Sequence, residues 1–394
     1  MQTQIMRTAE HVSEGHPDKF CDQVADRILD KVLTLAHEAE GRDKVANKDL
    51  PKIVRTAIEC LAKDNLLIVS GEVKLTPELR GQLNVIDLAR EVWERIDYGA
   101  GAEEHETGSG VSEKLTVIDH VRSQSADIKL GVDKGGAGDQ GIMVGYATDE
   151  TPEYMPQEYV YARNICQKLA EVRQAGDLPW LRSDCKSQVT LSPEGEVLSV
   201  IVAAQHFQKP GLSEEEIKEL AKQLKADVIK HVLRGVLPNL PDRVVVNGTG
   251  VFNVGGPTGD AGVVGRKIVV DAYGPRVPVG GGAYSGKDPT KVDRSAAYMA
   301  RLIAKTVVHE KVEGARECLV KLAYGIGQEQ PEMITAVTDA GKEVSAWVKE
   351  RFSDLSPRHI IERLGLQRPT GWSYLDTAAY GHYGRDIFPW EKVS

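Results

Sequence analysis

Apolar residues recur at helical spacing in several stretches of the chain, which predicts amphipathic helices. In the first stretch, Phe20, Val24, Ile28 and Val32 form one apolar stripe. Ser213 has a glutamate three positions later, the capping-box pattern of a helix start. The helices are expected over residues 17 to about 35, over 158–174, from 213 onward and from 289 onward.

Short runs rich in β-branched residues lie between these helices and predict strands. They cover residues 66–73, 142–148, 187–191, 197–204, 244–246, 267–273, 318–326 and 333–338. Strand pairs that alternate with long helices favour an α/β or α+β fold built from similar units. The polar residues 39–50 predict an exposed insertion, and the glycine- and glutamate-rich residues 99–110 predict a loop.

Length and composition narrow the class of protein. A chain of 394 residues exceeds one ordinary core, so we expect two or three domains. A formal net charge of −9 argues against a general nucleic-acid binder. No apolar run approaches the roughly 20 residues of a membrane span. The five scattered cysteines favour neither a disulfide framework nor a zinc site, which points to the cytoplasm.

A glycine-rich segment at residues 280–288 nearly matches the phosphate-binding loop G-x-x-x-x-G-K-[ST]. The pattern fits from Gly281 to Lys287, but Asp288 stands where a hydroxyl residue is required. Pro289 then predicts the first turn of a helix with Asp288 as its N-cap. Lys287 would therefore face a helix N-terminus, which favours an anion. An ordinary surface turn is the alternative.

The motif His16-Pro17-Asp18-Lys19 marks a second helix start. His16 suits contact with a phosphate, and Asp18 suits Mg²⁺, which prefers one or two carboxylates together with ligand phosphates. The alternative is an ordinary helix start, in which Asp18 only interacts favourably with the positive end of the helix dipole.

A third glycine motif has the spacing G-x-G-x-x-G at Gly136, Gly138 and Gly141. In a dinucleotide-binding fold this motif follows a strand and opens a helix, whereas here a predicted strand follows it. We therefore reject nicotinamide or flavin binding. The polar residues 124–139 predict a flap that excludes water.

Several cations lie on predicted loops beside glycine-rich turns. They are Lys186, Arg266 and Lys267, and Lys291 and Asp293 follow on the helix from residue 289. Each alone is a solvated surface charge by default, but their shared position beside glycine turns favours an anion site. Motifs for a serine hydrolase, a zinc protease or a protein kinase are absent from the sequence.

Together these motifs resemble the S-adenosylmethionine synthetase (methionine adenosyltransferase) family, with the chain as a divergent bacterial-type member. Residues 12–19, 136–146, 280–288 and 380–385 carry the resemblance, which runs through nearly the whole chain. It implies three related α/β units around a pseudo-threefold axis, at residues 1–127, 128–252 and 253–394. It also implies a homodimer or homotetramer with active sites between subunits.

The implied partners are ATP and L-methionine, and the implied cofactors are two Mg²⁺ per site and K⁺. Sulfur would attack the ribose 5′ carbon and displace triphosphate, which is then hydrolysed to phosphate and pyrophosphate. Sulfur has no proton to lose, so preorganised cations around the leaving triphosphate are the natural catalytic device. The sequence offers His16, Lys186, Arg266, Lys267, Lys287 and Lys291.

The resemblance also assigns roles to individual positions. Catalytic roles fall on His16, Lys186, Arg266 and Lys287. ATP contacts fall on these four and on Asp184, Phe252, Asp260, Lys267 and Ala283. Methionine contacts fall on Glu72, Gln124, Asp260 and Lys291. Metal ligands are Asp18 and Asp293 for Mg²⁺ and Glu59 for K⁺.

Two departures from the family pattern lie shortly before Phe252, the aromatic residue expected to stack on adenine. Val251 stands where the family usually has arginine, and Gly248 stands where it has proline. Two other functions remain open at this point. A kinase or ATP-dependent ligase would release ADP or AMP, and a silent nucleotide-binding regulatory subunit would lack His16, Asp18, Lys186 or Lys287, all of which are present.

Overall fold

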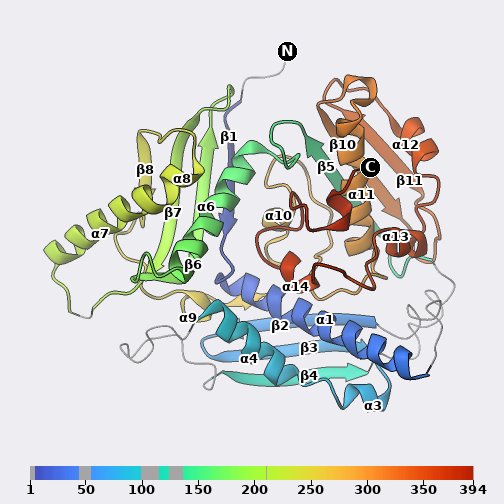
Figure 1. Cartoon of the computed structure of the whole chain (residues 1–394), viewed down its shortest axis with the longest axis horizontal. Helices are drawn as coiled ribbons and strands as arrows, with labels where there is room; N and C mark the ends of the chain where they lie inside the picture. The colour runs from blue at the N-terminus through green and yellow to red at the C-terminus, as the bar shows by residue number, and fades with distance from the viewer. Residues whose placement is uncertain (1–4, 44–54, 99–114, 124–135, 210, 394) are drawn as a thin grey trace.

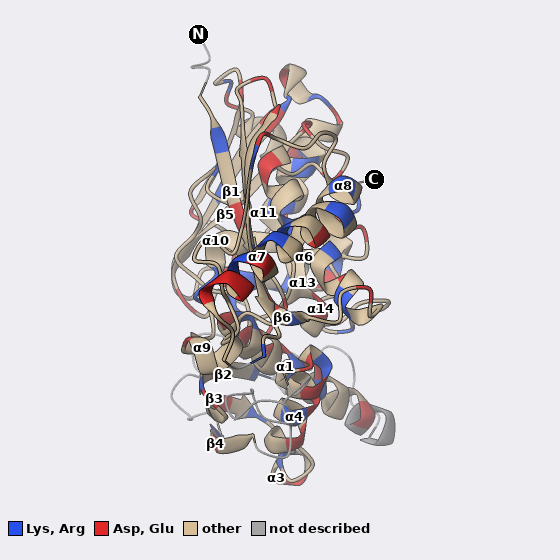
Figure 2. Ribbon diagram, turned by 90° about the vertical axis from the view of Figure 1, so that its left-hand side faces the viewer, with Lys and Arg blue, Asp and Glu red and all other residues tan. Residues whose placement is uncertain are grey.

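The computed structural model describes residues 5–43, 55–98, 115–123, 136–209 and 211–393 (Figure 1). Its named strands form three sheets, and helices pack on them. The expected α/β class is therefore confirmed. Within the described residues, no helix combines the length and apolar character of a membrane span. Basic and acidic residues are both spread along the ribbon (Figure 2).

The first sheet has the order β4-β3-β2-β9, with β4 parallel to β3 and the other pairs antiparallel. Helices α1 and α4 pack against it and against each other. Its strands are β2 (Arg55–Lys63), β3 (Leu66–Lys74), β4 (Thr116–Ser123) and β9 (Gly262–Val263), and its helices are α1 (Pro17–Asp43), α3 (Pro77–Arg80) and α4 (Val85–Ile96).

The second sheet has the order β1-β6-β7-β8 and carries helix α6 on one face. Its strands are β1 (Arg7–Val12), β6 (Leu181–Leu191), β7 (Val197–His206) and β8 (Arg243–Val246). Its helical elements are α6 (Gln157–Gln174), α7 (Glu214–Val228), the π-helical turn η4 (Ile229–Leu233) and α8 (Arg234–Val236). The predicted capping box of Ser213 and Glu216 is present at the start of α7.

The third sheet has the order β11-β10-β5, and the buried helix α11 packs on β5 and β10. Its elements are β5 (Gly141–Thr148), β10 (Glu317–Tyr324), β11 (Met333–Thr338), α11 (Val292–His309), α12 (Ser345–Arg351) and α13 (Pro357–Arg363). Short helical turns complete the chain: α9 (Gly256–Gly259), α10 (Ile268–Asp271), η5 (Val312–Gly314), α14 (Tyr374–Thr377) and η6 (Pro389–Glu391).

The three sheets share one plan. Each contains a hairpin whose first strand pairs antiparallel with a strand from another part of the chain: β2 with β9, β6 with β1, and β10 with β5. Each donated strand precedes a helix that packs on a different sheet, as β1 precedes α1. This common plan fits three related units. The divisions after residues 127 and 252 stay predictions, because every sheet takes one strand from across a predicted division.

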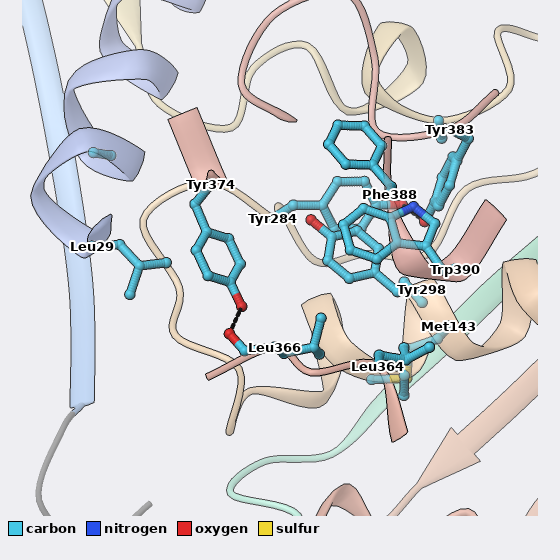
Figure 3. Close-up of a cluster of buried hydrophobic side chains, with 14 of the residues drawn as sticks. Leu29, Met143, Tyr284, Tyr298, Leu364, Leu366, Tyr374, Tyr383, Phe388 and Trp390 are labelled. Atoms are coloured by element: carbon cyan, nitrogen blue, oxygen red, sulfur yellow. Dashed lines mark hydrogen bonds between the residues drawn. The ribbon is translucent and has the colours of Figure 1, made fainter. Parts of the chain in front are cut away.

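Side chains of α11 and of the C-terminal segment form an aromatic cluster (Figure 3). The rings of Tyr298 and Trp390 stack with centroids 3.7 Å apart, and Phe388 stacks on Trp390 at 4.8 Å. The hydroxyl of Tyr374 donates a hydrogen bond to the carbonyl of Leu366. All of these aromatic rings are buried, so the C-terminal segment contributes Phe388 and Trp390 to the main core.

The periodicity of α1 is confirmed, because its four predicted stripe residues are fully buried. Two predicted elements are wrong. Helix α11 begins at Val292 and not at residue 289. Residues 267–273 contain the helical turn α10 (Ile268–Asp271) in place of a strand, because Asp271 is held against α1 by Lys19, Nζ to Oδ1 2.5 Å. This buried contact overrides the β-propensity of Ile268, Val269 and Val270.

Some predicted features lie outside the described residues. They are the insertion beyond residue 43, the loop at 99–110, most of the flap at 124–139, and Gln124. Strands β1, β2, β4 and β9 were missed by the sequence patterns.

Candidate active site

His16 lies in the turn between β1 and α1, and its side chain caps the helix. The backbone N–H of Asp18 donates to His16 Nδ1 at 3.1 Å, so the ring proton of neutral His16 sits on Nε2. Burial lowers the pKa of His16 to about 3, and the charges of Lys267 and Lys186 act in the same direction. His16 is therefore an uncharged hydrogen-bond donor at neutral pH. The sequence had suggested a cation.

Asp18 is buried one position beyond the start of α1 and holds the segment that precedes α10. Its Oδ1 accepts the N–H of Val263 at 2.9 Å, and its Oδ2 accepts Lys267 Nζ at 2.6 Å. The guanidinium of Arg266 lies 3.8 Å from Oδ1. Burial raises the pKa of Asp18, but the hydrogen bond and charge of Lys267 outweigh it, so the pKa stays below its ordinary value.

Asp184 and Lys186 lie inside strand β6 and not on a loop, as the sequence had suggested. Asp184 is buried, and its Oδ2 accepts the N–H of Gly256 at 2.8 Å. Its Oδ1 has no partner among the described residues. Burial raises the pKa of Asp184 to about 6. Lys186 is exposed two positions along the strand, on the same face. A hydrogen-bond donor on a ligand would satisfy the unpaired oxygen of Asp184.

A stripe of aspartates on α1 holds the segments that carry the site. The four residues lie at four-residue spacing, so they share one face of the helix. Each accepts backbone N–H groups from the C-terminal part of the chain: Asp18 from Val263, Asp22 from Gly265, Asp26 from Gly286, and Asp30 from Tyr374 and Leu375. Sequence analysis missed this stripe, although charged residues recurring on a buried helix were its signal.

The glycine-rich loop 280–288 is fixed from two sides at Lys287. Arg294 is fully buried and pairs with Asp26, Nη1 to Oδ1 2.7 Å, while the same Nη1 donates to the carbonyl of Lys287 at 2.9 Å. Asp26 Oδ1 also accepts the N–H of Gly286. Gly286 has a φ of +82°, a conformation that favours glycine. The peptide that carries Lys287 is therefore rigidly placed.

Asp288 does not cap a helix as expected. Its carboxylate accepts the N–H groups of Thr56 and Thr290 and the ammonium of Lys291, the last at 2.6 Å. Because these contacts tie residues 288–291 to β2, the α11 helix begins only after them.

The two glycine-rich motifs meet at Asp293, in the first turn of α11. A Cβ atom at Gly282 would lie 2.2 Å from Asp293 Cγ, and one at Gly141 would lie 3.3 Å from Asp293 Oδ1. Glycine at these positions thus leaves room around the carboxylate. Lys287 Nζ lies 2.7 Å from Asp293 Oδ2. The strand β5 begins at Gly141 and pairs antiparallel with β10, so the motif does not open a helix and the rejection of a dinucleotide site is supported.

The remaining predicted residues take different positions. Glu59 is exposed on β2. It lies two positions from Ala57, which forms an antiparallel β-bridge with Lys287. Partial burial raises the pKa of Glu59. Glu72 is half-buried on β3, opposite Ala57. The half-buried positions also include Phe252 and Ala283, and Asp260 is exposed.

Side-chain contacts and charge–charge interactions gather the candidate residues into two groups, which we call the α1 cluster and the α11 cluster. The α1 cluster contains His16, Asp18, Asp184, Lys186, Arg266 and Lys267. The α11 cluster contains Glu59, Lys287, Asp288, Lys291 and Asp293. Among the described residues, no side-chain ion pair joins one cluster to the other.

The carboxylates fit a metal that arrives with a polyphosphate. The described part of the chain holds no group of three or more histidine, cysteine, aspartate or glutamate residues that would form a metal site by itself. Asp18 and Asp293 each offer one carboxylate, and a lysine now occupies each of them. Mg²⁺ is typically bound by one or two carboxylates and by substrate phosphates, so this donor set suits it. Glu59 offers one exposed carboxylate to a second kind of cation.

Comparison with known proteins gives the same family along the whole chain. The models of the N-terminal, central and C-terminal domains of S-adenosylmethionine synthetase match residues 4–126, 134–252 and 254–392. The S-adenosylmethionine synthase of Chlorobium phaeobacteroides is 41% identical, with 100% of this chain and 96% of the relative aligned. That of Hyphomonas neptunium is 43% identical over 98% of this chain and 95% of the relative. The chain therefore belongs to the S-adenosylmethionine synthetase family.

Proposed function

We propose that the α1 and α11 clusters together form the site at which this chain makes S-adenosylmethionine from ATP and L-methionine. The family membership makes the chain a methionine adenosyltransferase, and its residues decide how it works. The observation that carries the proposal is the pair of lysine–aspartate contacts, Lys267 with Asp18 and Lys287 with Asp293. The lysine of each pair follows a backbone amide that is held by a buried aspartate of α1, Val263 by Asp18 and Gly286 by Asp26.

In the reaction the methionine sulfur attacks the ribose 5′ carbon of ATP. A carbon–sulfur bond forms, the bond from this carbon to the triphosphate oxygen breaks, and the electron pair leaves with the triphosphate. Sulfur becomes a sulfonium without losing a proton, so no general base is required. The triphosphate is then hydrolysed to phosphate and pyrophosphate. The chemical demand on the protein is to stabilise negative charge on the leaving group.

The cations of the two clusters meet this demand. Lys186, Arg266, Lys267 and Lys287 would contact the triphosphate as charges. His16 would donate a neutral hydrogen bond from Nε2, because its pKa of about 3 keeps the ring uncharged. Hydrogen bonds to charged groups contribute about 1.5–3 kcal/mol each, so loss of one lysine lowers turnover by roughly tenfold or more.

Asp18 and Asp293 would hold Mg²⁺, which supplies further charge neutralisation to the triphosphate when it is bound. Their lysine partners Lys267 and Lys287 would then be released from the carboxylates to the phosphate oxygens. Glu59 would hold K⁺ beside the Lys287 peptide.

The substrates would be gripped by the residues around these clusters. The unpaired Oδ1 of the buried Asp184 is suited to a donor group of the nucleoside, and the half-buried ring of Phe252 to its base. Asp260 and Ala283 are the further ATP contacts that the family pattern supplies. The amino and carboxylate groups of methionine would be bound by Glu72, Gln124, Asp260 and Lys291.

We also propose a homodimer in which each site is shared between two copies of the chain. The family resemblance, which implies active sites between subunits, supports this arrangement. The α1 cluster of one copy would face the α11 cluster of the other. Two such dimers would associate in a tetramer.

The activity is tested by supplying the protein with ATP, L-methionine, Mg²⁺ and K⁺ and identifying all products. We expect S-adenosylmethionine, phosphate and pyrophosphate. Accumulation of ADP or AMP without a sulfonium product would contradict the proposal. The Lys287→Ala variant should lose at least about tenfold in kcat, because one charge-assisted contact to the leaving group is removed. Lys222→Ala, which removes an exposed lysine on α7, is the control and should retain full activity.

A further inference from the structure

We infer that Tyr98 is a positioning residue for the α1 cluster, an inference that rests on the proposed function. Tyr98 follows the C-terminal end of α4, and its side chain is buried. Its hydroxyl donates a hydrogen bond to the carbonyl of Gly15 at 2.7 Å. Gly15 immediately precedes His16, so this bond acts on the backbone that carries the proposed triphosphate donor.

The Gly15 peptide is held on its other side by strand β6. A Cβ atom at Gly15 would lie 2.4 Å from the carbonyl carbon of Ser183, which leaves no room for a side chain. The Ser13 hydroxyl donates to the Ser183 carbonyl at 2.6 Å and accepts the N–H of Cys185 at 2.8 Å. The turn before α1 is therefore clamped between β6 and Tyr98.

The same ring also supports the anchor of Asp184. Gly256 has a φ of +59°, and a Cβ atom there would lie 2.7 Å from Tyr98 Cε1. The N–H of Gly256 is the donor to Asp184 Oδ2. A shift of the ring would thus move the backbone group that orients the Asp184 carboxylate.

The ring itself has little freedom. It packs against Trp93, with ring centroids 4.7 Å apart, and edge-on against Phe20 at 5.6 Å. Tyr98 thereby joins three segments of the site: the turn at Gly15, the glycine turn at Gly256 and the first turns of α1. It acts on His16 and Asp184 through the backbone.

The test compares Tyr98→Phe with Tyr324→Phe. Tyr324 is a matched control, because it is equally buried and its hydroxyl also donates to a backbone carbonyl, that of Leu355 at 2.6 Å, in the third sheet. Both substitutions remove one hydroxyl and should lower Tm by a similar few degrees. Only Tyr98→Phe should lower kcat/KM for ATP, by about tenfold or more, because small misplacements of catalytic groups are costly. KM for methionine should rise less than KM for ATP, because the Tyr98 hydroxyl bonds to the Gly15 carbonyl, beside His16, and not to a proposed methionine contact.

A second variant tests the packing of the Tyr98 ring against the glycine turn. Gly256→Ala places a methyl group against Tyr98 and should give the same selective loss in kcat/KM for ATP. Affinity for a nonhydrolysable ATP analogue, measured by calorimetry, reports on the same site without turnover and should weaken at least about threefold in Tyr98→Phe.

The inference is overturned if Tyr98→Phe matches Tyr324→Phe in kcat/KM for ATP and in affinity for the analogue. It is also overturned if KM for methionine rises as much as KM for ATP, because the effect would then reach the whole site and not the α1 cluster alone. Failure of the proposed function is a separate outcome: the unsubstituted protein would form no sulfonium product, while the affinity for the analogue would still test Tyr98.

Discussion

At the scale of single residues, burial decides the charge of the histidines. His11 is fully buried on β1, with its ring 5.4 Å from that of Tyr159 and 6.3 Å from that of Tyr380. Its Nε2 has no partner among the described residues. Burial lowers the pKa of His11 to about 3, as it does for His16. The unfolded chain binds a proton at the ordinary pKa of 6.5, so acidification below pH 6.5 favours unfolding through this group.

The His11→Asn variant tests this effect, because asparagine does not titrate and still offers polar atoms to the Val12 backbone. Between pH 7.5 and 5.5, protonation of His11 in the unfolded state should cost the unsubstituted protein about 1.4 kcal/mol. The free energy of unfolding of the variant should therefore improve by this amount relative to the unsubstituted protein over the same interval. Urea titrations at each pH measure the difference. A difference that does not change with pH would refute the assignment.

At the scale of elements, α1 is both a core helix and the frame of the site. Its apolar stripe packs on the first sheet, and its aspartate stripe holds backbone amides of three later segments. In addition to these backbone bonds, Asp26 forms a buried ion pair with Arg294. The pair is bidentate, with Nη1–Oδ1 2.7 Å and Nη2–Oδ2 2.8 Å. This pair joins α1 to α11 and to the peptide of Lys287.

Removal of one partner should be costly. Asp26→Ala leaves the guanidinium of Arg294 buried without its counter-charge, and the free energy of unfolding should fall by about 3–5 kcal/mol. Glu91→Ala is the control from the same part of the fold, because it breaks the exposed pair of Glu91 with Arg27 and should cost less than about 1 kcal/mol. Urea titration of both variants measures the contrast. Equal losses would mean that Asp26 is not the main connection.

At the scale of the whole molecule, each of the three sheets takes one strand from another part of the chain, so that the three sheets are linked in a cycle. Strand β1 joins the second sheet, β5 joins the third, and β9 joins the first (Figure 1). Each cluster of site residues lies where such an exchange occurs: the α1 cluster follows β1, and the α11 cluster adjoins the start of β5. The strand exchange is the physical link between the fold and the site.

The proposed sharing of sites between two copies predicts complementation. Asp18→Asn damages the α1 cluster, and Lys287→Ala damages the α11 cluster. In a mixed dimer of the two variants, one site would carry both substitutions and the other neither, so about half of the unsubstituted activity should return in a symmetric dimer. The mixed dimer can be isolated with two affinity tags after co-expression. Activity no higher than that of the parent variants would show that each site lies within one copy.

Local patterns in the sequence were sufficient for several parts of this picture. The apolar spacing of α1 and α6 and the capping box of α7 need only neighbouring residues, and they appear as expected. The family resemblance likewise rests on short motifs. Their glycines are required for steric reasons, since a side chain at Gly282 would collide with Asp293. Strand β1 was missed because its alternation is short and polar, and only pairing with β6 makes it a strand.

The site depended on more than local patterns. Residues 267–273 have the composition of a strand, yet a buried bond between Lys19 and Asp271, more than two hundred positions apart, makes them a turn. The charge state of His16 follows from burial beside Lys186 and Lys267, which no spacing along the chain reveals.

The sequence by itself determined helices α1, α6 and α7, most of the strands of the second and third sheets, the glycine motifs and the family, because these depend on contacts within a few positions or on short motifs. The tertiary structure alone decided that the two glycine motifs meet at Asp293, that α1 uses its aspartates to hold distant backbone amides, and that His16 is neutral. These properties arise from desolvation and from partners distant along the chain, and both come into being only when the chain is packed.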